Sequence, residues 1–260
     1  MSPGDIAELA KSSERAFRAS FSQQAPAQKD LYWRGLVLDR FDGRSWRASA
    51  ANPSFKRFNK IDQGRLYDHG ENTYEVMLEP SNQSWVYALE PSRASSSNLL
   101  VKDMGLFQLS TDAIQATRYK MTFKDVASSK VSKVPGAKVL LGKDRAESTY
   151  MKDLLAPKNS NPRTQRYIEQ LRASYPNKED LLAHLMAKFS QQRFYYSLKP
   201  PLLGADFVDE FLFETKRGFC AHYAGSLAYM LRLAGIPARV VVGYQGGEYN
   251  AQGGYYIIHQ

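Results

Sequence analysis

The sequence predicts an α+β fold, in which a β-rich N-terminal domain precedes a core of helices and an antiparallel sheet. Short alternating or aromatic segments separated by turn residues fill the first half of the chain, as expected for strands. From residue 161 onward the apolar residues recur at helical spacing. With 260 residues, of which 43% are hydrophobic, the chain is long enough for two domains with normal cores.

The N-terminal half is expected to form an antiparallel sandwich or barrel-like domain. Its strand-like segments occupy, in order, residues 16–21, 31–38, 73–78, 85–89 and 116–123. Four aromatic residues of this half have two possible uses, because they either pack in its core, the commoner role, or offer a flat surface to a carbohydrate or peptide. They are Tyr32, Trp33, Trp46 and Trp85.

A polar, lysine-rich stretch with poor periodicity begins at residue 124 and marks a domain boundary. We therefore assign residues 1–135 to the β-rich domain, 136–160 to a linker and 161–260 to the second domain.

The second domain opens with two predicted helices. Asn161 followed by Pro162 is typical of an N-cap and a first helical residue, and predicts a helix that ends near Ser174. Asn177 is expected to cap the next helix, whose apolar stripe lies between residues 181 and 189. These helices are expected to pack against a third helix and a small sheet.

The third helix begins at Cys220, the only cysteine of the chain. Gly218 permits a tight loop into this helix, and Gly235 followed by Pro237 ends it. The free N–H groups and the dipole of a helix start stabilise a thiolate, so Cys220 is the candidate nucleophile. The alternative is that Cys220 is a small buried apolar residue.

Residues 215–244 resemble the nucleophile segment of the transglutaminase-like superfamily, relatives of papain-type cysteine enzymes. The resemblance rests on Gly218, Cys220 and the Gly-Ile-Pro-Ala-Arg run at 235–239, and it extends to the aromatic run at 194–198 and to Leu-Tyr-Trp-Arg-Gly at 31–35. It points to the bacterial branch in which a multispanning membrane region precedes a periplasmic portion that ends in a transglutaminase core.

This resemblance implies a cysteine acyltransferase or protease, without a cofactor. The Cys220 thiolate would attack a glutamine-type or other amide carbonyl, form a thioester and release the acyl group to an amine or to water. The Cys220 backbone N–H and the hydroxyl of Tyr196 are the candidate oxyanion donors. The resemblance also implies a multi-pass protein at the periplasmic face of the bacterial inner membrane, acting on a protein or peptide of the cell envelope.

The general base is expected outside the segment that carries the nucleophile. The family uses a His as base and an Asp to orient it, and we expect both to follow residue 260, so that the 260-residue fragment by itself is inactive. His222 lies two residues after Cys220 and points elsewhere on a helix, which indicates packing or capping. His259 is the alternative base, on a strand expected to pair beside residues 238–244.

Other function classes find little support. The net charge is +9, but Lys and Arg are scattered and no nucleic-acid signature appears, so we expect no nucleic-acid partner. The four His and the single Cys show no metal-ligand spacing. No apolar run of membrane-spanning length occurs, so the fragment is expected to be soluble. The alternative function is a non-catalytic periplasmic module that holds a peptide or glycan in the same fold.

Overall fold

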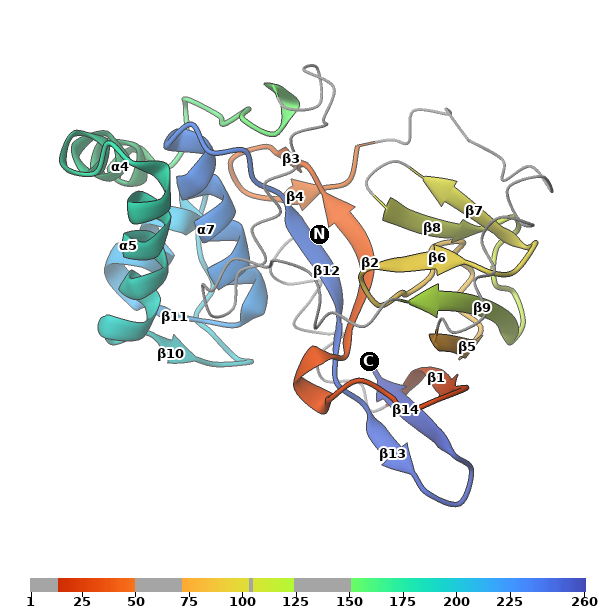
Figure 1. Cartoon of the computed structure of the whole chain (residues 1–260). Helices are drawn as coiled ribbons and strands as arrows, with labels where there is room; N and C mark the ends of the chain where they lie inside the picture. The colour runs from red at the N-terminus through yellow and green to blue at the C-terminus, as the bar shows by residue number, and fades with distance from the viewer. Residues whose placement is uncertain (1–13, 50–71, 103–104, 124–150) are drawn as a thin grey trace. The chain divides into compact units, whose positions relative to one another are not determined.

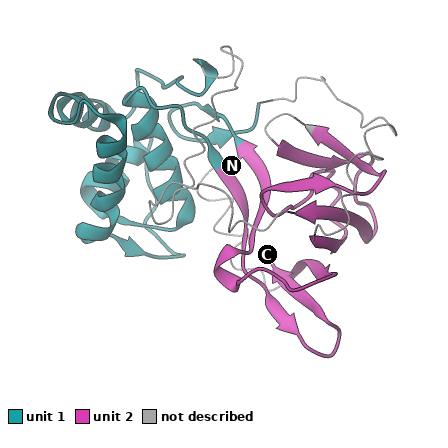
Figure 2. Ribbon diagram, in the orientation of Figure 1, with its two compact units in different colours: residues 1–10, 38–50, 130–240 teal, residues 11–37, 51–129, 241–260 magenta. Residues whose placement is uncertain are grey.

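The computed structural model describes residues 14–49, 72–102, 105–123 and 151–260 (Figure 1). It confirms the α+β fold, with antiparallel strands in the first half of the chain and helices mainly in the second. The chain forms two compact units that interleave along the sequence (Figure 2). Unit 1 includes residues 38–50 and 130–240, and unit 2 includes residues 11–37, 51–129 and 241–260.

The elements follow one another in the order given by their labels. The strands are β1 (Arg15–Phe21), β2 (Tyr32–Leu38), β3 (Arg40–Phe41), β4 (Trp46–Arg47), β5 (Asn72–Leu78), β6 (Ser92–Ala94), β7 (Leu99–Lys102), β8 (Leu106–Leu109), β9 (Thr117–Phe123), β10 (Tyr195–Tyr196), β11 (Arg217–Gly218), β12 (Val240–Gln245), β13 (Glu248–Asn250) and β14 (Tyr255–His259). The helical segments are the 3-10 turn η1 (Gln28–Asp30), α4 (Pro162–Ser174), α5 (Lys178–Gln191), α6 (Phe207–Asp209), the π-helical turn η4 (Glu210–Thr215) and α7 (Cys220–Leu233).

Unit 2 is built on a six-stranded antiparallel sheet with the order β13-β14-β1-β5-β9-β6. Alternate residues of its central strands face one core, so that buried Phe17 lies opposite buried Leu78. Trp33 is fully buried in this core, and its indole N–H donates to the carbonyl of Gly246 at 2.9 Å. Trp46 of unit 1 is also buried, so these two tryptophans serve as core residues and not as a binding platform.

The pairing expected for the last strand is wrong. β14 does not lie beside residues 238–244 but pairs with β1, with Phe17 opposite Ile258, while β12 pairs with β2. The two backbones of β12 and β2 approach closely, since a Cβ added at Gly243 would lie 2.1 Å from the carbonyl oxygen of Trp33. After β12, Gly246 adopts a positive φ of 76° and turns the chain away, and Ile258 then packs into the core of unit 2.

The proposed domain boundaries stay a prediction, because residues 124–150 lie outside the described residues. The described end of the expected linker packs within unit 1. There Asp153, almost fully buried, forms an ion pair of 2.6 Å with Arg239.

Helix α4 begins where the sequence predicts, but its cap is different. Asn161 occupies the N-cap position with a φ of 53° and makes no side-chain cap bond. Its side-chain oxygen instead accepts from the N–H groups of Val208 and Asp209, at 2.9 and 3.3 Å. The Asp209 carboxylate accepts from the N–H groups of Arg163 and Thr164, at 2.8 and 2.7 Å. A buried carboxylate distant in sequence therefore caps α4. Helix α5, by contrast, is capped by the side chain of Asn177, as expected.

Both ends of α7 confirm the sequence signals. At its start, the buried His222 ring accepts a hydrogen bond from the Phe219 N–H through Nδ1 at 3.3 Å, which confirms its expected capping role. Burial lowers the pKa of His222 to about 4, so the ring is neutral. At the other end Gly235 has a φ of 76°, and the Ile236 N–H bonds the Leu231 carbonyl at 2.8 Å, as in a Schellman motif.

The last turn of α7 carries a buried arginine. The Arg232 guanidinium donates to the carbonyl oxygens of Asp39, Leu155 and Ala238, at 2.7–2.9 Å. It lies over the indole of Trp46, 4.7 Å from the ring centroid. Burial lowers the pKa of Arg232 to about 10, against the opposing effect of nearby carboxylates. Arg232 is therefore still charged at neutral pH and joins three segments of unit 1.

None of the helices in the described part of the chain combines the length and the apolar character that crossing a membrane requires.

We predict that the two caps differ in strength. Replacing Asp209 with Ala should lower the free energy of unfolding by about 3 kcal/mol, because it leaves buried N–H groups without an acceptor. Replacing Asn177 with Ala removes an exposed cap and should cost about 1 kcal/mol. Urea unfolding followed by far-ultraviolet circular dichroism measures both, and equal losses would contradict a buried cap at α4.

We also predict a pH-dependent contribution from His222. The unfolded chain takes up a proton at this residue below a pKa of about 6.5, whereas the folded chain resists it down to about 4. Stability from this group is therefore complete above pH 6.5 and is lost as the pH falls toward 4, by at most about 3 kcal/mol.

The matched test compares His222→Gln with His184→Gln in urea unfolding at several pH values. Glutamine at the third helical position can accept the same bond from the N-cap N–H but does not titrate. His222→Gln should therefore be less sensitive to pH than the wild type between 6.5 and 4. The same slope in His222→Gln and the wild type would show that the proton is not excluded from His222.

Candidate active site

Cys220 is the first residue of α7, and its side chain is exposed. The chain enters the helix from β11 through Phe219. This residue is buried, and its ring packs edge-on against that of His222 with 4.5 Å between the ring centroids. The exposure excludes the alternative that Cys220 is a buried apolar residue. It places the sulfur where a substrate can reach it, beside the free N–H groups of a helix start.

The approach to the nucleophile requires a glycine. A Cβ added at Gly218 would lie 2.7 Å from Cβ of His222 and 2.9 Å from the ring of Phe211. Such contacts are too short for any side chain, so only glycine allows β11 to pass over these two rings. Gly218 is therefore required by the packing of β11 on these rings, and not only by the tight loop that the sequence predicted.

The short strand β10 brings Tyr196 to Cys220. β10 and β11 pair in parallel, with Tyr196 opposite Gly218, and the Ser197 N–H donates to the Gly218 carbonyl at 2.8 Å (Figure 1). The Tyr196 hydroxyl lies close enough to Cys220 for the charge and the polar groups of that cysteine to shift its pKa. Burial, and then the charge of the cysteine, raise the pKa of Tyr196. The hydroxyl thus keeps its proton at neutral pH and can donate it in a hydrogen bond.

A layer of aromatic rings packs beside Tyr196 and the first turn of α7. The ring of Tyr223, one turn into α7, stacks on that of Tyr196 with 6.3 Å between centroids, and packs on Phe211 at 5.1 Å. Phe211 reaches this place through the π-helical turn η4, which ends where the Lys216 N–H bonds the Phe211 carbonyl at 3.0 Å. A π-helical turn is often found at functional sites. No local pattern of residues indicated this turn in advance.

His259 lies in unit 2, whereas Cys220 and Tyr196 lie in unit 1. On β14 it sits opposite Arg15, and its Nε2 is 3.9 Å from a carboxylate oxygen of Glu248. The structure thus brings Cys220 and Tyr196 together. The role of His259 as a base stays a prediction.

The Arg239 of the Gly-Ile-Pro-Ala-Arg run has a structural role that sequence reasoning missed. It pairs with Asp153, and both side chains are at least nine-tenths buried. The motif drew attention to Arg239, but its partner lies 86 residues upstream, where no local pattern marks it.

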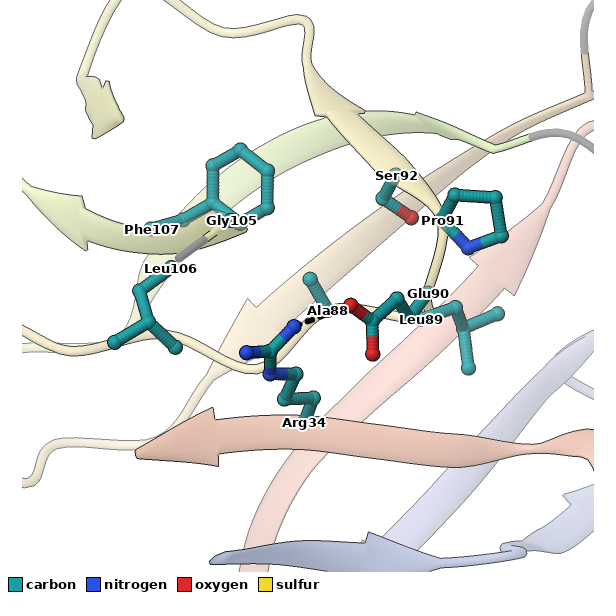
Figure 3. A pocket seen from close by; sticks show the side chains of 9 residues that line it. All are labelled: Arg34, Ala88, Leu89, Glu90, Pro91, Ser92, Gly105, Leu106 and Phe107. Carbon is teal, nitrogen blue, oxygen red and sulfur yellow. Dashed lines mark hydrogen bonds and ion pairs between the residues drawn. The ribbon is translucent and has the colours of Figure 1, made fainter. Parts of the chain in front are cut away.

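A small cavity of about 170 Å³ lies in unit 2, apart from the nucleophile's unit (Figure 3). An ion pair between Arg34 and Glu90 crosses it. The residues that line it are Arg34, Ala88, Leu89, Glu90, Pro91, Ser92, Gly105, Leu106 and Phe107.

Two family models match the chain. The model described as "TgpA N-terminal domain" matches residues 1–130, and the model described as "Transglutaminase-like superfamily" matches residues 165–259. The second match contains Cys220 and Tyr196.

Among curated proteins, the chain is 40% identical over 261 residues to a protein-glutamine gamma-glutamyltransferase of Pseudomonas aeruginosa, covering 100% of this chain and 36% of the relative. It is 25% identical over 244 residues to the uncharacterized protein YebA of Bacillus subtilis, covering 85% of this chain and 32% of the relative. The chain thus spans about a third of the length of the curated relatives it matches.

Among solved structures, the periplasmic domain of TgpA from Pseudomonas aeruginosa matches with a TM-score of 0.81 and 35% identity, covering 100% of this chain and 84% of that chain. The same domain bound to ethylmercury also matches with a TM-score of 0.81, covering 86% of that chain. On these matches, the chain belongs to the transglutaminase-like superfamily, in the bacterial branch whose core follows a TgpA N-terminal domain.

Proposed function

We propose that this chain is the nucleophile-bearing part of a periplasmic cysteine enzyme that acts on glutamine-type or peptide amide groups. The observation that carries this proposal is the exposed Cys220 at the start of α7, with the Tyr196 hydroxyl beside it. The name of the Pseudomonas relative supports protein glutamine as the acyl donor. The periplasmic origin of the similar crystal structure supports the location, and the resemblance supports a membrane anchor.

The geometry suits nucleophilic attack with oxyanion stabilisation. The Cys220 sulfur forms a bond to the amide carbonyl carbon, and the carbonyl oxygen takes up the negative charge. The Cys220 N–H and the Tyr196 hydroxyl donate to that oxygen. The C–N bond then breaks, ammonia or an amine leaves with a proton from the general acid, and a thioester remains. An amine or water attacks the thioester and restores the thiol.

We further propose that the general base is a His outside these 260 residues, oriented by an Asp, as the resemblance implies. The described histidines of unit 1 are otherwise engaged. His222 is buried and caps α7, and His184 on α5 stacks on Tyr175 with 4.6 Å between the ring centroids. A positioned base contributes about 10² to 10⁴ in rate, so the 260-residue chain alone should turn over very slowly.

The two residues of the site can be tested in the full-length protein by amine incorporation into a glutamine donor. Cys220→Ala should abolish incorporation. Tyr196→Phe should lower kcat about 10²-fold through loss of one oxyanion donor. It should leave alkylation of Cys220 by iodoacetamide nearly unchanged, because that reaction forms no oxyanion. Tyr249→Phe, an exposed tyrosine of unit 2, is the matched control.

Full incorporation by Cys220→Ala would refute the nucleophile. No incorporation by the wild-type full-length protein would favour instead the non-catalytic module that holds a peptide or glycan.

The base can be tested by comparing His259→Gln with His184→Gln in the same assay, in the full-length protein and in the 260-residue chain. Neither change should lower kcat appreciably in the full-length protein. Strong turnover by the 260-residue chain that His259→Gln abolishes would assign the base to His259, against this proposal.

A further inference from the structure

The strand that carries Tyr196 continues into an exposed apolar surface. Tyr195 is 52% exposed, Leu198 is 40% exposed and Leu202 is fully exposed. Large apolar side chains that gather on a surface are typical of a binding site. Tyr195 and Leu198 lie within two residues of Tyr196 along the chain, and they belong to the same unit as Cys220, so an extended substrate held at the sulfur can reach this surface.

Four basic side chains lie in the segments that contain β10 and β11. Within the described residues, none of them forms an ion pair with a carboxylate. Two of them rest on aromatic rings, Lys216 at 5.7 Å from the centroid of Phe194 and Arg217 at 5.9 Å from that of Tyr195. The full set is Arg193, Lys199, Lys216 and Arg217.

The acidic side chains of this stretch are occupied with other contacts. Two of them serve the start of α4, where Asp206 accepts from the Asn161 N–H and Asp209 caps the helix. The other two are Glu210, which accepts from the Gly204 N–H, and Glu214, which pairs with Arg163. In the described part of the chain, none of these four carboxylates therefore pairs with the four basic side chains, which stay available to an acidic ligand.

The backbone of β10 offers a place for an extended chain. Among the described strands β10 pairs with β11 alone, which leaves its other edge for a further strand. Successive side chains of a strand lie on opposite faces, with Tyr196 toward Cys220 and Tyr195 toward Arg217. A peptide that pairs with β10 and offers its glutamine to Cys220 thus places the neighbouring side chains on the face of Tyr195 and Arg217.

We propose that the acyl donor is an extended protein segment with acidic residues next to the reactive glutamine. The apolar surface takes up its aromatic or aliphatic side chains, and the four basic residues bind its carboxylates. The inference rests on the proposed function for the site, and it adds the class of substrate.

The test uses two synthetic peptides with the same Leu-Gln-Phe centre, one flanked on both sides by Glu-Asp and the other by Lys-Lys. Each is added to the full-length protein during alkylation of Cys220 by iodoacetamide, a neutral reagent, and the alkylated fraction is followed by mass spectrometry. The acidic peptide should protect Cys220 at about tenfold lower concentration than the basic one. Raising the salt from 50 to 500 mM should weaken that protection, since charges at an exposed surface are screened.

The double variant Lys216→Glu with Arg217→Glu should lose the preference for the acidic peptide or reverse it. The control is Arg166→Glu on the exposed side of α4, which changes charge away from β10 and should keep the preference. The comparison of the two peptides on the wild type needs no variant, so a misfolded double variant does not remove the test.

The outcomes separate this inference from the proposed function. Equal protection by both peptides, or protection that salt does not weaken, overturns the acidic-donor inference, while Cys220-dependent incorporation still stands. If the full-length protein shows no Cys220-dependent incorporation, the proposed function fails. Preferential protection by the acidic peptide in that case would still show a surface that selects acidic segments.

Discussion

The buried guanidinium of Arg232 is the contact on which the position of α7 depends. It binds the carbonyl oxygens of Asp39, Leu155 and Ala238, which come from three separate segments of unit 1. Hydrogen bonds from a charged donor are each worth about 1.5–3 kcal/mol, which offsets the loss of hydration that lowers the pKa of this group. Because Cys220 begins the same helix, an anchor in its last turn also fixes the nucleophile along the helix axis.

The other end of α7 combines packing and chemistry within a few residues. Gly218 fits against two rings, His222 closes the backbone of the first turn, and Cys220 between them faces solvent. Phe211 packs on the rings of both His222 and Tyr223, so an apolar layer supports the helix turn that carries the sulfur. A nucleophile fixed in this way loses little freedom when substrate binds, which is the condition for efficient positioning.

The sequence predicted the features that local chemistry determines. The start of α4 at Pro162, the cap of α5 and the full extent of the Cys220 helix were correct, because each depends on residues within a turn of one another. The misses involve distant partners. Asp209 caps α4 from 45 residues away, and β14 pairs with β1 from the far end of the chain. The spacing of residues along a short segment carries no information about such distant contacts. The site residues Cys220 and Tyr196, by contrast, were identified from the family resemblance and from the residues next to them in the sequence.

The pairing of β1 with β14 has a consequence for how the protein folds. Phe17 and Ile258 lie opposite each other although about 240 residues separate them in the chain. During synthesis, one edge of β1 therefore stays open until β14 has left the ribosome, which takes roughly ten to fifty seconds at usual elongation rates. Contacts this distant slow folding, and an open apolar edge attracts other chains. The sheet of unit 2 is therefore complete only once β14 has been made and has reached β1.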